Sequence, residues 1–136
     1  MELMVERRKF RGKVVKGLGE GEKYLEIPYY KEAFSRKFGF QPFPGTLNLR
    51  VEEDRWVLEH LKKHGSKVKG CEHEGRKLGA VYCCKGKTGE LEVVVILPEL
   101  TKHESTVELI APQSLRKALQ LSDGDEVWVE ISCDKQ

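Results

Sequence analysis

The sequence predicts a mainly β domain, a small barrel whose strands are joined by short helices. Short apolar segments of strand-like composition recur along the 136 residues, and turns that contain glycine or proline separate them. Only a few short segments show the spacing of a helix. At about 150 residues per domain, the length indicates a single domain, residues 1–136. Many short strands with few helices are typical of a barrel.

The first half of the chain is predicted to contain three strands and two helices. Apolar residues of the first helix recur at helical spacing, and Gly39 stands where a C-capping glycine belongs. In the third strand, Leu47, Leu49 and Val51 alternate with polar residues. In chain order, the expected elements are a strand at Phe10–Lys16, a strand at Tyr24–Ile27, a helix containing Tyr30, Ala33, Phe34 and Phe38, a strand at Thr46–Val51 and a helix at Asp54–His64.

The second half is predicted to be a loop, a β-hairpin and two further strands separated by a helix. Residues 65–77 are rich in glycine and charge, so we expect a loop there. The remaining expected elements are strands at Leu78–Lys85 and Leu91–Leu97 joined by a turn at Gly86–Gly89, a strand at Val107–Ile110, a helix from Pro112 that buries Leu115, Ala118 and Leu119, a turn at Asp123–Asp125 and a strand at Val127–Ile131.

The charge balance and the hydropathy argue against several classes of protein. Lys and Arg number 24 and Asp and Glu number 22, so the net charge is only +2, whereas a dedicated nucleic-acid binder carries a basic excess. The longest apolar run, Val93–Leu97, is far shorter than a membrane span. The segment Met1–Glu6 is short and acidic, so we expect no signal peptide and a cytoplasmic location.

The cysteines and histidines do not predict a metal site. The four cysteines are Cys71, Cys83, Cys84 and Cys133. They form no C-x-x-C pair, adjacent Cys83 and Cys84 would point to opposite faces of a strand, and we expect all four to be reduced. His60 and His64 are four residues apart on the second predicted helix, but the glutamate of the zinc-protease motif is missing. We interpret them as part of a solvated helix face and exclude a structural zinc site.

Two glycine-containing segments resemble phosphate-binding motifs. Gly17–Gly21 is G-x-G-x-G, and a backbone without Cβ atoms can approach a ligand and present N–H groups to phosphate oxygens. A flexible hairpin loop fits the same residues, so both interpretations stay open. Gly86–Thr88 ends like a P-loop, but Val81 stands where that motif needs its first glycine, and the segment joins two strands. We therefore assign Gly86–Thr88 to a hairpin turn.

The segment Pro42–Asn48 is the most specific local feature. Two prolines and a glycine make it a rigid turn that leads into a strand. Thr46 and Asn48 share one face of that strand, with Cα atoms about 6–7 Å apart. Their hydroxyl and carboxamide are hard oxygen ligands for Mg²⁺, which takes six oxygens and is completed by substrate phosphates and water. We expect them to hold Mg²⁺ chiefly with a nucleotide present; a polar strand face bonded to a neighbouring loop is the alternative.

Four segments, taken together and in order, resemble one family. They are Gly17–Gly21, Pro42–Asn48, Glu108–Pro112, and Leu115-Arg116 with Asp123–Asp125. They are similar to the archaeal CTP-dependent riboflavin kinases over residues 10–131, and Pro42–Asn48 is the most specific part. The resemblance implies a single cradle-loop (Greek-key, RIFT-like) β-barrel. It also implies a phosphotransferase that moves the γ-phosphoryl of CTP to the 5′-hydroxyl of riboflavin, giving FMN and CDP. Mg²⁺ would be the cofactor, with no nucleic-acid or membrane partner, and the protein would be a monomer.

The resemblance also implies roles for individual residues. By residue, the implied nucleotide contacts are Gly17, Leu18, Gly19, Glu20, Gly21, Glu22, Gln113, Ser114, Leu115 and Arg116. Thr46 and Asn48 would hold Mg²⁺, and Thr101 and Glu108 would contact the flavin. Glu108 is also the candidate to orient, and to deprotonate, the ribityl hydroxyl. Alternative polar contacts in the same loop are His103 and Glu104. The preference for CTP rests on the resemblance alone.

A competing hypothesis comes from the C-terminal half. Pro112–Leu119 followed by Val127–Val129 is also similar to swapped-hairpin transcription factors of the AbrB type. In that alternative, basic residues line a DNA face, and Thr46 and Asn48 are incidental. A third hypothesis is a flavin- or nucleotide-binding relative without activity. The small net charge and the rigid turn before Thr46 favour the kinase.

Overall fold

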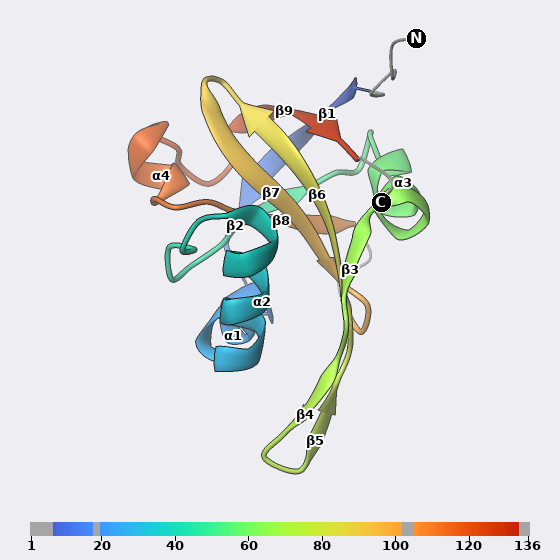
Figure 1. Cartoon of the computed structure of the whole chain (residues 1–136). Coiled ribbons are helices and arrows are strands. Elements are labelled where there is room, and N and C mark those ends of the chain that lie inside the picture. Colours follow the sequence, from blue (N-terminus) through green and yellow to red (C-terminus); the bar gives the residue numbers. More distant parts are fainter. Residues whose placement is uncertain (1–6, 18–19, 102–104, 134–136) are drawn as a thin grey trace, which may run out of the picture.

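The computed structural model describes residues 7–17, 20–101 and 105–133, which form nine strands and four helices (Figure 1). In chain order, the elements are β1 (Arg7–Val15), α1 (Glu20–Glu26), α2 (Pro28–Phe38), β2 (Leu47–Arg50), α3 (Trp56–His64), β3 (Ser66–Val68), β4 (Cys71–His73), β5 (Arg76–Leu78), β6 (Val81–Thr88), β7 (Leu91–Pro98), β8 (Thr106–Ile110), α4 (Leu115–Ala118) and β9 (Glu126–Ser132). The protein is mainly β with short helices, as the sequence predicts.

Six antiparallel strands close into a barrel in the order β6-β7-β8-β2-β1-β9. β6 closes the barrel because its later residues, Lys85–Lys87, pair with Glu130–Ser132 of β9. The earlier residues of β6 pair with β3 on the same edge. A closed barrel leaves few strand edges to pair with other molecules. The predicted small barrel is confirmed.

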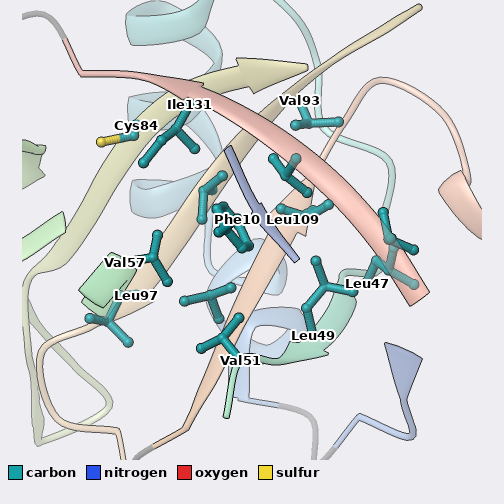
Figure 2. Packing of buried hydrophobic residues seen from close by; sticks show 14 of the residues in the cluster. Phe10, Leu47, Leu49, Val51, Val57, Cys84, Val93, Leu97, Leu109 and Ile131 are labelled. Carbon is teal, nitrogen blue, oxygen red and sulfur yellow. The ribbon is translucent and has the colours of Figure 1, made fainter. Parts of the chain in front are cut away.

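Alternate residues of the strands fill the interior of the barrel, as Figure 2 shows. Phe10, Leu49, Leu109 and Ile131 come from four different strands and are at most 1% exposed. Val57 of α3 joins the same cluster, so this helix packs on the barrel core. Burying each such side chain contributes about 1.5–3 kcal/mol before entropy is counted.

A second apolar layer lies on the outer face of the barrel, under the α1–α2 helical hairpin. Tyr30 and Phe34 of α2 pack on Val94 and Ile96 of β7 and on Ile110 of β8. These strand residues alternate with the residues that fill the interior. The two helices therefore cover the outer face of β7 and β8 (Figure 1).

The ends of α2 follow the local signals in the sequence. Pro28 occupies the first turn, where its missing N–H costs nothing. Gly39 ends the helix in the left-handed region, with φ of 77°, and its N–H donates to the carbonyl of Ser35. The predicted helix is confirmed.

Two segments have a secondary structure of a different type from the one predicted. The expected strand Tyr24–Ile27 overlaps helix α1 instead, in which Leu25 is buried and the ring of Tyr24 packs edge-on against Tyr30 at 4.7 Å. The expected loop 65–77 instead contains β3, β4 and β5, and the β4–β5 hairpin extends away from the barrel (Figure 1). Glu74 and Gly75 connect that hairpin with φ of 50° and 75°. Positive φ at both central residues is the geometry of a type I′ turn.

The predicted β6–β7 hairpin is confirmed, but its turn lies later than expected. β6 extends to Thr88, so Gly86–Thr88 belong to the strand and the connection is at Gly89 and Glu90. A Cβ built on Gly86 would lie 2.6 Å from the carbonyl oxygen of Glu130, so the glycine permits the close approach of β9. Gly86–Thr88 is thus no phosphate loop.

Helix α4 is shorter and less buried than predicted. It spans four residues, Leu115–Ala118, and begins after the N-cap Ser114. Leu115 is buried, but Ala118 is exposed and Leu119 is half-buried. The apolar spacing in this segment therefore overstates how far the helix continues, because the chain turns at Leu119 toward the Asp123–Asp125 turn.

The expectation of reduced cysteines is wrong for two of them. Cys84 and Cys133 form a disulfide with Cα atoms 5.0 Å apart, although 49 residues separate them. Their neighbours Lys85 and Ser132 are paired between β6 and β9, so barrel closure brings the two cysteines together. Cys83 points to the opposite face, as predicted, and burial raises the pKa of its thiol to about 12.

The histidine pair on α3 is also less exposed than predicted. His60 is 9% exposed, because its ring packs edge-on against Trp56 at 5.6 Å and lies 4.9 Å from the ring of His64. The prediction that His60 lies on a solvated helix face is therefore wrong. Every helix in the described part of the chain is too short or too polar to cross a membrane.

Candidate functional site

The candidate site lies on the outer face of β2, between β1 and β8. Asn48 is paired with Val15 of β1 on one side and with Glu108 of β8 on the other. Leu47 and Leu49 belong to the barrel interior, so Asn48 between them faces outward. Glu108 faces outward for the same reason. The strand register therefore places two polar side chains from distant parts of the sequence directly opposite each other.

Thr46 joins this pair through a hydrogen bond. Its Oγ1 donates to Oε1 of Glu108 at 2.6 Å, and Glu108 is only 4% exposed. A hydroxyl has one hydrogen and two lone pairs. Because the hydrogen is used toward Glu108, the lone pairs of Thr46 can serve a cation. We use the name polar cluster for Thr46, Asn48 and Glu108.

The rigid turn before β2 is attached to the end of β8. The N–H of Phe43 donates to the carbonyl of Ala111 at 2.8 Å, and the N–H of Gly45 donates to the carbonyl of Phe43 at 2.8 Å. Ala111 follows β8 directly. The turn therefore fixes Thr46 relative to the strand that carries Glu108.

The glycine cluster begins beside Asn48. A Cβ built on Gly17 would lie 2.5 Å from Nδ2 of Asn48, closer than real Cβ atoms come to a neighbour. Glu20–Glu22 form the start of helix α1 rather than a loop or strand, while Leu18 and Gly19 lie outside the described residues. The predicted nucleotide segment thus starts at the polar cluster and continues into a helix.

Arg116 reaches the same end of β1. Its Nη2 lies 3.5 Å from the carbonyl oxygen of Val15 and 2.7 Å from Oδ1 of Asp123. Ser114 caps α4 by accepting from the N–H of Lys117 at 3.4 Å. Leu115 is buried in the barrel core, so any contact that it makes with a nucleotide would come from its backbone. Gln113, beside them, is exposed.

Thr101 is not brought to the polar cluster by the strand register. It follows β7, and its N–H donates to the carbonyl of Pro98 at 3.3 Å. The β7 residue opposite Glu108 is Ile96, so Thr101 lies several residues further along the β7–β8 connection. The alternative contacts His103 and Glu104 lie outside the described residues. Sequence reasoning placed Asp123 in a turn and in a segment that carries the resemblance, but it did not find the contact to Arg116.

The donor set of the polar cluster fits Mg²⁺ that arrives with a nucleotide. Thr46 and Asn48 supply neutral hard oxygens, and the Glu108 carboxyl lies beside them. The described residues contain no group of three or more His, Cys, Asp or Glu side chains that would hold a metal ion. A cation here would therefore need phosphate oxygens or water to complete its shell.

A large groove lies elsewhere. It has a volume of about 710 Å³ and runs along the β4–β5 hairpin, with Gly79 and Leu100 among its lining residues. Among the predicted site residues that the structure describes, none lines this groove. The polar cluster is instead defined by strand register and hydrogen bonds.

Comparison with known proteins covers most of the barrel. A family model named CTP-dep_RFKase, described as a domain of unknown function (DUF120), matches residues 14–131. The riboflavin kinase of Methanosarcina barkeri is 42% identical over 123 residues, which are 88% of this chain and 55% of that protein. The riboflavin kinase of Sulfolobus acidocaldarius is 39% identical over 129 residues, 90% of this chain and 80% of that protein. The riboflavin kinase of Pyrobaculum aerophilum is 42% identical over 125 residues, which are 88% of this chain and 59% of that protein.

The match begins at the end of β1 and ends in β9, so one family domain contains most of the barrel and the whole polar cluster. The chain belongs to the CTP-dependent riboflavin kinase family. It spans little more than half the length of the Methanosarcina and Pyrobaculum proteins.

Proposed function

We propose that this chain transfers the γ-phosphoryl group of CTP to the 5′-hydroxyl of riboflavin, giving FMN and CDP. The observation that carries the proposal is the convergence of Thr46, Asn48 and Glu108 on one face, next to Gly17. The names of the relatives support riboflavin as substrate, and the name of the family model supports CTP. The proposal includes action as a monomer in the cytoplasm.

Gly17 and Arg116 are the groups that we assign to the nucleotide phosphates. At Gly17 the absence of a Cβ lets a ligand approach the backbone. The guanidinium of Arg116 lies at the end of β1, where it could pair with phosphate oxygens in a bidentate way. Positive charge fixed near the transferring phosphoryl stabilises the negative oxygens of the transition state.

Thr46 and Asn48 are the residues that we assign to Mg²⁺. When bound, the ion would neutralise charge on the phosphate oxygens. Thr46 is oriented by Glu108, and Asn48 is positioned by its place in the centre of the β1–β2–β8 sheet. Neither side chain is charged, so cation binding is expected to be weak without the nucleotide.

Glu108 is the residue that we assign to the ribityl hydroxyl of riboflavin. Phosphoryl transfer depends mainly on in-line positioning, and a carboxylate that accepts the hydroxyl proton fixes the attacking oxygen. Glu108 is buried among strand residues and held by Thr46, so its position is defined before substrate binds. Thr101 is retained as a proposed flavin contact, further along the β7–β8 connection.

The direct test is to incubate the protein with riboflavin, Mg²⁺ and one nucleoside triphosphate at a time and to separate FMN by chromatography. We expect FMN with CTP and little with ATP, GTP or UTP. Absence of FMN with every nucleotide would contradict the proposal. Binding to duplex DNA with a steep dependence on salt would instead support the DNA-binding alternative.

Replacement of Asn48 tests the role in cation binding. Asn48→Ala removes one oxygen ligand, so we expect a roughly tenfold or greater increase in the Mg²⁺ concentration for half-maximal turnover. Arg50→Ala is the matched control, because Arg50 lies two residues further on the same outward face of β2 and is exposed. Wild-type turnover of Asn48→Ala at limiting Mg²⁺ would contradict the assignment.

A further inference from the structure

An ion pair between Arg116 and Asp123 lies at the end of β1, just before the glycine cluster. Oδ1 of Asp123 is 2.7 Å from Nη2 of Arg116, and the same nitrogen is 3.5 Å from the carbonyl oxygen of Val15. Val15 ends β1, two residues before Gly17. Arg116 is therefore held between a turn near the C-terminus and the strand that leads into the predicted nucleotide segment.

The turn that carries Asp123 is itself fixed to β1. The N–H of Gly124 donates to the carbonyl of Val14 at 2.7 Å, and the N–H of Val14 donates to the carbonyl of Asp125 at 2.8 Å. Gly124 has φ of 95°, which a residue with a side chain rarely adopts. These bonds set the Asp123 carboxylate at a defined distance from the end of β1.

We propose that Asp123 is a positioning residue that orients the Arg116 guanidinium toward the phosphates of the nucleotide. This inference rests on the proposed function. A guanidinium has five N–H donors in a planar fork. The contacts to Asp123 and Val15 both use Nη2. The N–H groups on the other nitrogens of the guanidinium can therefore donate to a phosphate. Without Asp123, the arginine would lose rotamer freedom only when the nucleotide binds, and the affinity would fall.

Because the Arg116–Asp123 pair is exposed, its effect on nucleotide binding can be measured separately from its effect on folding stability. The side chains of Arg116 and Asp123 are 40% and 57% exposed. Exposed ion pairs contribute little to folding. A large effect of Asp123 on nucleotide binding, without a matching change in thermal stability, would therefore report on orientation.

The same turn offers a matched control. Asp125 lies two residues after Asp123, but its Oδ2 accepts from the N–H of Ser122 at 2.8 Å and so stabilises the turn itself. Asn can make the same bond. Asp125→Asn should therefore leave the affinity for nucleotide unchanged.

The experiment measures the dissociation constant of CDP in the presence of Mg²⁺ by titration calorimetry, together with the melting temperature and the KM for CTP. For Asp123→Ala, which removes the acceptor of Arg116, we expect an increase in Kd of about 3- to 10-fold, a similar increase in KM, and an unchanged kcat. Asp123→Glu should restore part of the affinity. In an Arg116→Ala background, Asp123→Ala should have no further effect, because the residue that Asp123 orients is gone.

Two results would overturn the inference alone. One is wild-type affinity of Asp123→Ala while Arg116→Ala binds CDP weakly. The other is the same loss from Asp123→Ala with and without Arg116. If the wild-type protein binds neither CDP nor CTP, the proposed function itself is wrong, and this inference falls with it.

Discussion

Asn48 shows how closely the candidate site is packed at the scale of single residues. It lies between Val15 and Glu108 in the sheet, and Gly17 leaves room for its carboxamide. Gly17 is not among the glycines with positive φ. Its backbone would therefore accept an alanine, and the nearest obstacle to the added methyl in the described residues is the Asn48 side chain.

Gly17→Ala is expected to weaken cation binding while leaving the fold intact. The added methyl would push the Asn48 amide aside, and the far end of a side chain moves at little cost to stability. We expect a severalfold weaker binding of Mn²⁺ in the presence of CDP, measured by electron paramagnetic resonance, with a melting temperature near that of wild type. In an Asn48→Ala background the loss should be smaller, because the methyl there would hinder only the approach of the nucleotide to the Gly17 backbone. An equal loss in both backgrounds would contradict the part of the effect that acts through Asn48.

Glu108→Gln separates positioning from proton transfer. The Gln carbonyl can still accept from Thr46, so the orientation of that hydroxyl is kept. The carboxylate that would accept the ribityl proton is lost, and a general base contributes about 10²–10⁴-fold. We expect kcat to fall within that range and the Kd of CDP to stay within twofold. A kcat equal to that of wild type would show that Glu108 is no base.

At the scale of elements, local signals predicted those helices and strands whose ends carry their own capping or turn residues. α2 has Pro28 at its start and Gly39 at its end, and the alternation around Leu47 and Leu49 identified β2. The prediction for α1 was wrong because four residues, Tyr24–Ile27, fit the periods of a helix and a strand equally well. Its helical state depends on packing against α2.

The prediction missed the β4–β5 hairpin for a different reason. Its strands are three residues long and largely polar, and Glu74-Gly75 is not the Asn-Gly or Asp-Gly pair that signals a two-residue turn. Contacts from α2 support the base of the hairpin. The hydroxyls of Tyr29 and Tyr30 donate to the carbonyls of Lys69 and Gly79 at 2.9 and 2.8 Å. None of these contacts can be read from local sequence.

The disulfide between β6 and the end of β9 gives a prediction about stability. Cys133→Ala opens a loop whose ends are 49 residues apart. Loop-closure entropy for that length corresponds to about 4 kcal/mol, within the usual 2–5 kcal/mol for a native disulfide. We expect the free energy of unfolding in urea to fall by this order under oxidising conditions. With excess reductant the variant and the wild type should become equal, and a difference that persists would contradict the role of the disulfide.

At the scale of the whole molecule, barrel closure assembles the site. The alternation in β2 predicted that Thr46 and Asn48 share a face, and the structure places both on the outer side. Glu108, 60 residues beyond Asn48, comes opposite it only through the β2–β8 register. Arg116 and Asp123 reach the end of β1 only because β9 pairs with β1. Residue types could be predicted from sequence, but their distances depend on long-range pairing.

The most direct test of the account is a crystal structure of the protein with CDP and Mn²⁺, with the ion located by its anomalous scattering. The account predicts a peak about 2.1–2.3 Å from Oγ1 of Thr46 and Oδ1 of Asn48, with phosphate oxygens completing the shell. A Mn²⁺–CDP complex bound elsewhere, with these two oxygens contacting only protein, would contradict it.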